Sequence, residues 1–160
     1  MNPTLDQSSY VISLDEIFWG GILVAITMAM HGFGMLLVHR VNYAIKQWIG
    51  KRTGILANLL PVIFASWMIM LVHLIEVAVW AGFFLWRGAF PNHSLAYYFS
   101  LNEYTTVGSN FNLPLHWRLL EGMLAMTGLL TFAWSTGVLI TLAQEFQELR
   151  LQLFRQRHDK

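Results

Sequence analysis

Residues 105–110 form a run of small and polar residues whose backbone oxygens, rather than any reactive side chain, could serve as ligands. The run consists of Thr105, Thr106, Val107, Gly108, Ser109 and Asn110. A cation that leaves water needs fixed oxygens, and backbone carbonyls aimed into a narrow axis can supply them. Such a run needs alternating backbone handedness, which favours glycine wherever φ is positive. Thr106, Val107 and Gly108 fit this requirement, and the sequence predicts that they hold K+ or Na+, with the Thr106 hydroxyl as a further oxygen.

Three ionisable residues lie inside apolar segments, where they are costly and often functional. His31 interrupts the first segment, and His73 and Glu76 lie three residues apart on one helix face of the second. The simplest interpretation is a buried polar contact between helices, with His31 or another group of the first segment as partner. The alternatives are a pH or metal sensor, or a cofactor site. Histidines with Met28 and Met35 would suit Cu(I), and two histidines would suit haem.

The composition indicates a chain built for lipid. It has 160 residues, of which 56% are hydrophobic and 12% charged, whereas soluble domains carry about 25% charged residues. The sequence lacks a basic stripe with interleaved aromatics, which is the pattern that indicates nucleic-acid binding. The absence of cysteine excludes thiol chemistry. Because the sequence has no HExxH motif, phosphate-binding loop or plausible Ser-His-Asp order, we expect no enzyme and no covalent cofactor.

Three segments are long and apolar enough for membrane helices, which need about 20 residues. We predict an all-α membrane protein with transmembrane helices at 17–39, 55–86 and 118–142. The apolar segment 94–103 is too short to cross, so we predict a re-entrant pore helix and filter loop over 94–112. Ser94 is the expected N-cap of this helix, whose C-terminal dipole would face the cation.

The distribution of Lys and Arg predicts the orientation. Segment 1–16 carries neither, so we place it outside the cytoplasm. The loop 40–54 is basic, and the amphipathic tail 143–160 is basic at its end, so both are placed in the cytoplasm. Their basic residues are Arg40, Lys46, Lys51 and Arg52 in the loop, and Arg150, Arg155, Arg157 and Lys160 in the tail.

Two stretches carry a resemblance to a known family: YFSLNEYTTVG and WRLLEGMLAMTGLLTFAWST, which together fall within residues 97–137. Their order resembles the potassium-channel pore domain, and more closely a bacterial ion channel family with one extra span before the pore. His73 and Glu76 with Trp80-Ala81 also resemble its second span. The resemblance implies a homotetramer around a central pore, which conducts monovalent cations across the bacterial inner membrane. A single chain cannot supply a ring of carbonyls, which independently favours an oligomer.

The filter departs from the family pattern. The family's Gly-Tyr-Gly-Asp is replaced by Gly108-Ser109-Asn110, so the bracing aromatic residue, the second glycine and the acid are missing. Asn110 still tolerates the left-handed region better than most residues. We therefore expect the inner carbonyls to survive and the outer sites to widen. This predicts a pore that passes K+ with weak discrimination against Na+. The alternatives are a metal- or haem-binding membrane protein and a non-conducting structural subunit.

The third span carries a glycine and an apolar face. In potassium-channel pores a glycine at the spacing of Gly128 is the usual bend point, and glycine weakens a helix by up to about 1 kcal/mol. Close helix packing is the alternative for Gly128. Leu129, Phe132, Thr136 and Ile140 recur on one face. They would line the cavity and a gate that closes by dewetting, or else pack against a neighbouring helix.

Overall fold

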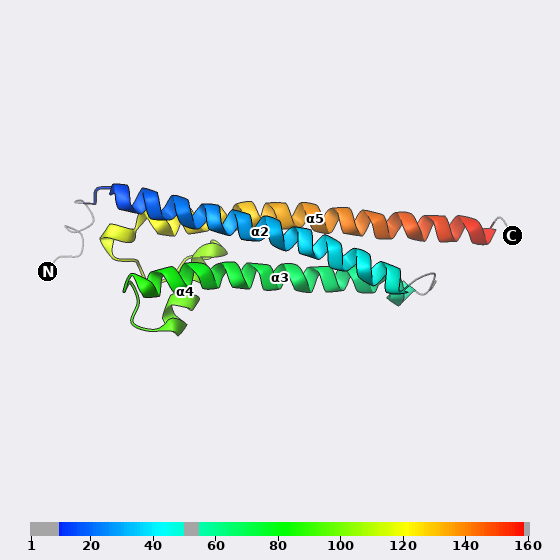
Figure 1. Ribbon diagram of the computed structural model, residues 1–160, viewed down its shortest axis with the longest axis horizontal. Coiled ribbons are helices and arrows are strands. Elements are labelled where there is room, and N and C mark those ends of the chain that lie inside the picture. The colour runs from blue at the N-terminus through cyan, green and yellow to red at the C-terminus, as the bar shows by residue number, and fades with distance from the viewer. Residues whose placement is uncertain (1–9, 50–54, 159–160) are drawn as a thin grey trace. The chain divides into compact units, whose positions relative to one another are not determined.

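A computed structural model describes residues 10–49 and 55–158, and every regular element in these ranges is helical. The elements are α2 (Leu14–Ile49), α3 (Ile55–Trp86), α4 (His93–Tyr104), η1 (Leu115–Trp117) and α5 (Leu119–His158). Three helices, α2, α3 and α5, are long and apolar enough to cross a membrane (Figure 1). The predicted all-helical chain with three long apolar helices is thus confirmed.

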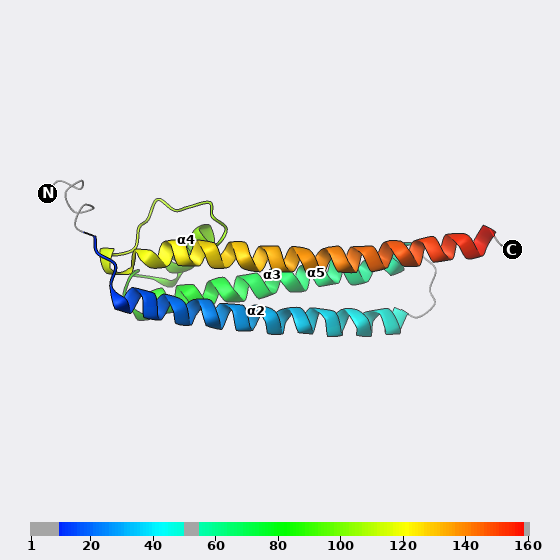
Figure 2. The same cartoon turned by 90° about the horizontal axis from the view of Figure 1, so that it is seen from above.

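The long helices continue past the ends that the sequence predicted. α2 runs to Ile49 instead of ending at residue 39, so residues 40–49 of the predicted loop are helical. α5 runs to His158 and includes most of the tail predicted to begin at residue 143. Neither extension contains glycine or proline, and without a helix breaker a helix can continue beyond the thickness of a bilayer. Figure 2 shows this extension of α5.

α2 also begins earlier than predicted, at Leu14, because Ser13 and Glu16 form a capping box. The Glu16 backbone N–H donates to Ser13 Oγ at 3.2 Å, and the Ser13 N–H donates to Glu16 Oε2 at 3.0 Å. The other Glu16 oxygen, Oε1, accepts the N–H of Leu119 at 3.0 Å. One fully buried carboxylate therefore satisfies N–H groups at the start of both α2 and α5.

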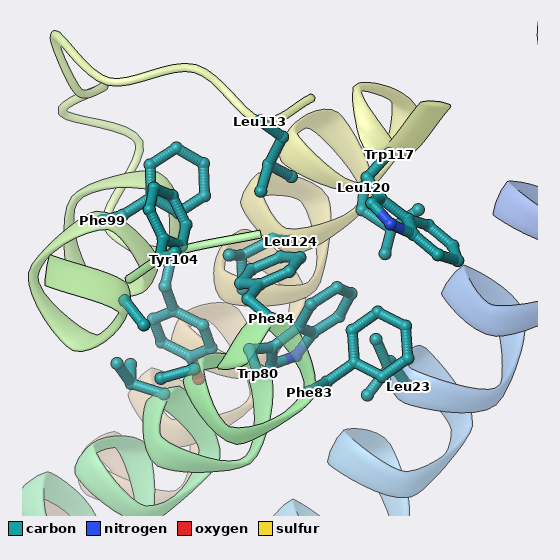
Figure 3. Packing of buried hydrophobic residues seen from close by; sticks show 14 residues of the cluster. Leu23, Trp80, Phe83, Phe84, Phe99, Tyr104, Leu113, Trp117, Leu120 and Leu124 are labelled. Carbon is teal, nitrogen blue, oxygen red and sulfur yellow. The ribbon is translucent and has the colours of Figure 1, made fainter. Parts of the chain in front are cut away.

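The chain forms two compact units, and the first comprises Met1–Met30 and Leu74–Thr131. Its core is aromatic and joins α3 to α4 and to the start of α5 (Figure 3). Phe84 of α3 meets Phe99 of α4 edge to face, with ring centroids 5.7 Å apart. Edge-to-face pairs add about 1 kcal/mol to the burial of their rings. This packing fixes α4, and residues 105–110 follow directly from its end.

The second unit comprises His31–His73 and Phe132–Lys160. Its core is aliphatic and consists of Met35, Val38, Ala65, Ile69, Val138 and Leu142. Lys46 of α2 and Glu145 of α5 form an ion pair in this unit. Because both side chains are substantially exposed, we assign this pair little stabilisation.

Candidate functional site

α4 ends where the candidate site begins. Its N-cap is Asn92 and not Ser94, because the backbone of Asn92 is extended, whereas Ser94 already lies inside the helix. Asn92 Oδ1 accepts the Leu95 N–H at 2.9 Å. At the other end Thr105 is the C-cap, so residues 106–110 leave the helix directly.

The chain turns at Thr106, whose φ of 60° makes it the one non-glycine residue with positive φ among those described. The Thr106 N–H donates to Glu103 O at 2.9 Å, and the Val107 N–H donates to Asn102 O at 3.0 Å. These bonds are the Schellman arrangement, in which the left-handed position is usually glycine. A β-branched residue there is an outlier that costs about 1–2 kcal/mol. Backbone strain of this kind clusters at functional sites.

A row of carbonyls follows from the same hydrogen bonds. The N–H groups of Thr106, Val107 and Gly108 all donate to carbonyls in the last turn of α4. In a trans peptide the C=O points opposite to the N–H of the same unit. The carbonyls of residues 105, 106 and 107 therefore point away from α4. The Ser109 N–H donates to Glu103 Oε1 at 2.9 Å, which turns the carbonyl of Gly108 away from Glu103.

These four carbonyls, of residues 105–108, are called the carbonyl row below. Gly108 has a φ of 79°, so positive φ occurs at residues 106 and 108 but not at Val107 between them. This is the alternation predicted from the sequence. Val107 is 75% exposed in the single chain. The row therefore offers several uncharged oxygens on the exposed side of the loop, and such oxygens suit a monovalent cation.

Glu103 holds the outer end of the loop through its bond to Ser109, a role that the sequence analysis missed. Burial raises the pKa of the Glu103 carboxyl, the Ser109 N–H lowers it, and the negative charge of Glu121 raises it, for a net increase. Ser109 Oγ accepts the Phe111 N–H at 3.1 Å, and Asn110 is exposed. Glu103 could have been noticed as the single acidic residue of α4.

Tyr104, the last residue of α4, forms a buried cluster that the sequence analysis also missed. Its hydroxyl donates to Glu76 Oε2 at 2.5 Å and pairs with Thr131 Oγ1 at 2.6 Å. Tyr104, Glu76 and Thr131 are all buried, and they are called the Tyr104 cluster below. Burial, followed by the bond to Glu76, raises the pKa of Tyr104. The phenol therefore stays protonated and ties α4 to α3 and α5 immediately before the carbonyl row.

Gly128 lies against this same point of α4. A Cβ on Gly128 would stand 1.9 Å from the carbonyl oxygen of Tyr104. No real side chain tolerates such a distance, so close packing accounts for this glycine. The helix of α5 continues without interruption through Gly128.

The remaining residues of the predicted pore face are exposed on α5 in the single chain. They are Leu129, Phe132, Thr136 and Ile140. Leu130 and Trp134 are exposed as well, so the exposed surface of α5 is wider than the predicted stripe. Contiguous apolar surface of this kind indicates contact with lipid or with another protein.

His31 and His73 are buried and meet on one hydroxyl. Ser135 Oγ lies 3.2 Å from His31 Nε2 and 3.0 Å from His73 Nε2, and the two ring centroids are 5.3 Å apart. His31, His73 and Ser135 are called the histidine cluster below. A hydroxyl has one proton and accepts through its lone pairs. Which of these atoms donates depends on the tautomer of each imidazole. Sequence reasoning found both histidines but not Ser135.

No family model, curated protein or solved structure matches this chain. The membership of a bacterial ion channel family therefore stays a prediction, carried by the quoted motifs.

Proposed function

We propose that the chain is the subunit of a homotetrameric cation channel in the bacterial inner membrane, which conducts K+ with weak discrimination against Na+. The observation that carries this proposal is the carbonyl row. Residues 105–108 turn successive uncharged oxygens away from α4, and known cation filters use carbonyl oxygens to replace the ion's water shell.

Assembly follows from the need to surround the ion. One chain supplies one row, whereas potassium filters combine four loops around an axis. The exposed Val107 and the exposed apolar face of α5 support the same conclusion, because contacts with neighbouring subunits would cover them. The segments 1–16 and 105–110 would then face outward, with the ends of α2 and α5 in the cytoplasm.

Weak selectivity follows from the unequal support of the two ends of the row. The Tyr104 cluster anchors its inner end, and Glu103 holds the peptide of Ser109. Asn110 is exposed, and its polar amide would admit water at the mouth. Selectivity depends on well-defined dehydrated sites, and fewer of these remain here than in a filter with a bracing aromatic residue.

Liposomes that contain the full chain test conduction. We expect both K+ and Na+ flux, with a reversal potential between the two ion limits under opposed gradients. Gly108→Ala should abolish flux, because alanine is strained at a φ of 79°. Gly82→Ala is the matched control, since a Cβ on Gly82 meets nothing within 4 Å.

Three results would count against the proposal. A reversal potential at the K+ limit refutes weak selectivity. If neither the wild type nor the double variant Ser109→Tyr/Asn110→Gly gives ion flux, conduction is refuted. A stable monomer or dimer in native mass spectrometry refutes the tetramer.

A second candidate function is transition-metal binding by the histidine cluster, favoured by the two imidazole nitrogens directed at one hydroxyl. Imidazole suits zinc, copper and haem iron. Elemental analysis and an optical spectrum of the purified protein test this function. His31→Gln should remove a bound metal, whereas His93→Gln, at an exposed position, should not. A metal-free, colourless wild type that takes up neither zinc nor copper would exclude it.

A further inference from the structure

Arg87 follows the last residue of α3 and is surrounded by tryptophans. Its Cζ lies 4.6 Å from the ring centroid of Trp117, 5.3 Å from that of Trp86 and 5.5 Å from that of Trp19. These rings come from η1, α3 and α2. Cation–π contacts of this kind hold a guanidinium by its faces, so its N–H groups remain directed outward at the edges.

The guanidinium borders a pocket of about 450 Å³ in the first unit. The pocket is lined by Ser13, Asp15, Trp86, Arg87, His116 and Trp117. It therefore contains both a cation, Arg87, and an anion, Asp15. In the described part of the chain these two side chains form no ion pair with each other. Opposite charges that share a pocket without pairing leave room for a ligand that itself carries both charges.

The pocket lies at the ends of all three apolar spans. Asp15 is near the start of the span Leu14–Trp48, Trp86 ends the span Leu59–Trp86, and His116 is near the start of the span Leu115–Glu148. Tryptophan and arginine at span ends are typical of the level of lipid headgroups. A ligand at this depth would have its acyl chains in the bilayer and its headgroup in the pocket.

We propose that this pocket binds a zwitterionic phosphate ester with a primary ammonium group, the phosphoethanolamine headgroup of a phospholipid. The phosphate would accept hydrogen bonds from the N–H groups at the edge of the Arg87 guanidinium, a geometry that suits phosphate well. The ammonium group would donate to the Asp15 carboxylate. This assignment does not depend on the proposed pore.

The charges and rings also favour this headgroup over two common alternatives. An anionic headgroup without an ammonium group would leave Asp15 uncompensated beside the phosphate. A choline headgroup binds through aromatic faces, but Arg87 already occupies the tryptophan rings. A quaternary ammonium also has no N–H to donate to Asp15. The primary ammonium is therefore the best match.

Native mass spectrometry of the full chain tests the proposal, with phosphatidylethanolamine, phosphatidylcholine and phosphatidylglycerol of identical acyl chains at equal concentration. We expect the ethanolamine lipid to be retained about tenfold over each of the others, since one charge-assisted bond corresponds to about this factor. Arg87→Gln and Asp15→Asn should each remove the preference, and Arg87→Lys should weaken it. Arg118→Gln is the matched control, because Arg118 does not line the pocket.

The outcomes separate this site from simple interfacial anchoring. Equal retention of the three lipids, or stronger retention of phosphatidylglycerol, overturns the proposal. So does a preference that survives in Asp15→Asn. Soluble O-phosphoethanolamine distinguishes a free ligand from a lipid. We expect it to bind at least about tenfold more weakly, because it buries no acyl chain, and equal binding would overturn the lipid assignment. Circular dichroism of each variant establishes that loss of preference is not loss of fold.

Discussion

The Tyr104 cluster and the histidine cluster are built from similar parts but differ in what they can do. Each takes a hydroxyl from α5, Thr131 in one and Ser135 in the other, and a titratable residue from α3, Glu76 in one and His73 in the other. In the Tyr104 cluster a phenol with a raised pKa keeps its proton and donates it to Glu76. In the histidine cluster the donor and acceptor roles depend on the tautomers of the two imidazoles.

The difference shows how a buried polar group can either fix a backbone or remain adjustable. Tyr104 directly precedes the carbonyl row, and fixing its side chain fixes the start of that row. The residues of the histidine cluster belong to the long helices and not to the loop of the carbonyl row, so we expect a change in its proton arrangement to leave that row unchanged. We therefore expect structural rigidity from the Tyr104 cluster and any proton- or metal-dependent behaviour from the histidine cluster. The following substitutions test this division.

Gly128→Ala should have the largest effect, because the new Cβ would collide with the Tyr104 carbonyl oxygen. Backbone atoms cannot move aside as a flexible side chain can, so we expect a loss of about 3 kcal/mol in the free energy of unfolding. Thermal melts in detergent measure it. Gly122→Ala on the same helix meets nothing within 4 Å and should be neutral or slightly stabilising. Equal melting temperatures for the two variants would contradict the close packing at Tyr104.

Tyr104→Phe should have the next largest effect. It removes the hydroxyl bonded to Glu76 and Thr131, and each of these two lost hydrogen bonds costs about 0.5–1.5 kcal/mol. We also expect reduced ion flux, because the start of the carbonyl row loses its anchor. Tyr98→Phe, at an exposed position of α4, is the control. The rigid role of Tyr104 fails if both variants melt and conduct alike.

Ser135→Ala should destabilise the chain by about 1 kcal/mol, less than Tyr104→Phe, because two adjacent imidazoles can rearrange their hydrogen bonds. It should leave ion flux unchanged. The control is Ser66→Ala, which removes an exposed hydroxyl that donates to the backbone of its own helix. Flux that falls as much in Ser135→Ala as in Tyr104→Phe would show that the histidine cluster also supports the proposed pore.

The sequence predicted the parts of this molecule that depend on local composition. Apolar length identified α2, α3 and α5, and the run of small residues at 105–110 indicated where the short helix α4 ends. The helix ends were harder to predict. No glycine or proline in residues 40–49 marks an end for α2. At α4, both Asn92 and Ser94 are good N-cap residues, and the extended backbone at Asn92 selects it.

Most partners of the buried polar residues could not be predicted because they come from distant positions. His31 was expected as a partner of the pair His73 and Glu76, and its ring centroid lies 5.3 Å from that of His73. The bond that Glu76 accepts from Tyr104, 28 residues further along the chain, was not expected. Ser135 is one of several hydroxyl residues on α5, and only the packed helices bring it to both histidines. Gly128 was recognised as either a bend or a packing contact, and the carbonyl of Tyr104 decides for packing.

Glu103→Gln should have the smallest effect, and it tests whether the outer end of the carbonyl row is adjustable while the inner end is fixed. Burial, opposed by the Ser109 N–H and reinforced by the charge of Glu121, raises the pKa of Glu103 above its ordinary value. Its contribution to stability is therefore greatest below the ordinary carboxyl range and is lost as pH rises through the raised pKa. Glutamine keeps an oxygen that can accept the Ser109 N–H but never ionises. The melting temperature of Glu103→Gln should fall less than that of the wild type as pH rises through the ordinary carboxyl range, by on the order of 1–2 °C.

Glu148→Gln, at an exposed position of α5, should follow the wild type. If Glu103→Gln instead lost more stability than the wild type over this range, the carboxylate would be the form that the fold prefers, and the outer end would be held as firmly as Tyr104 holds the inner one.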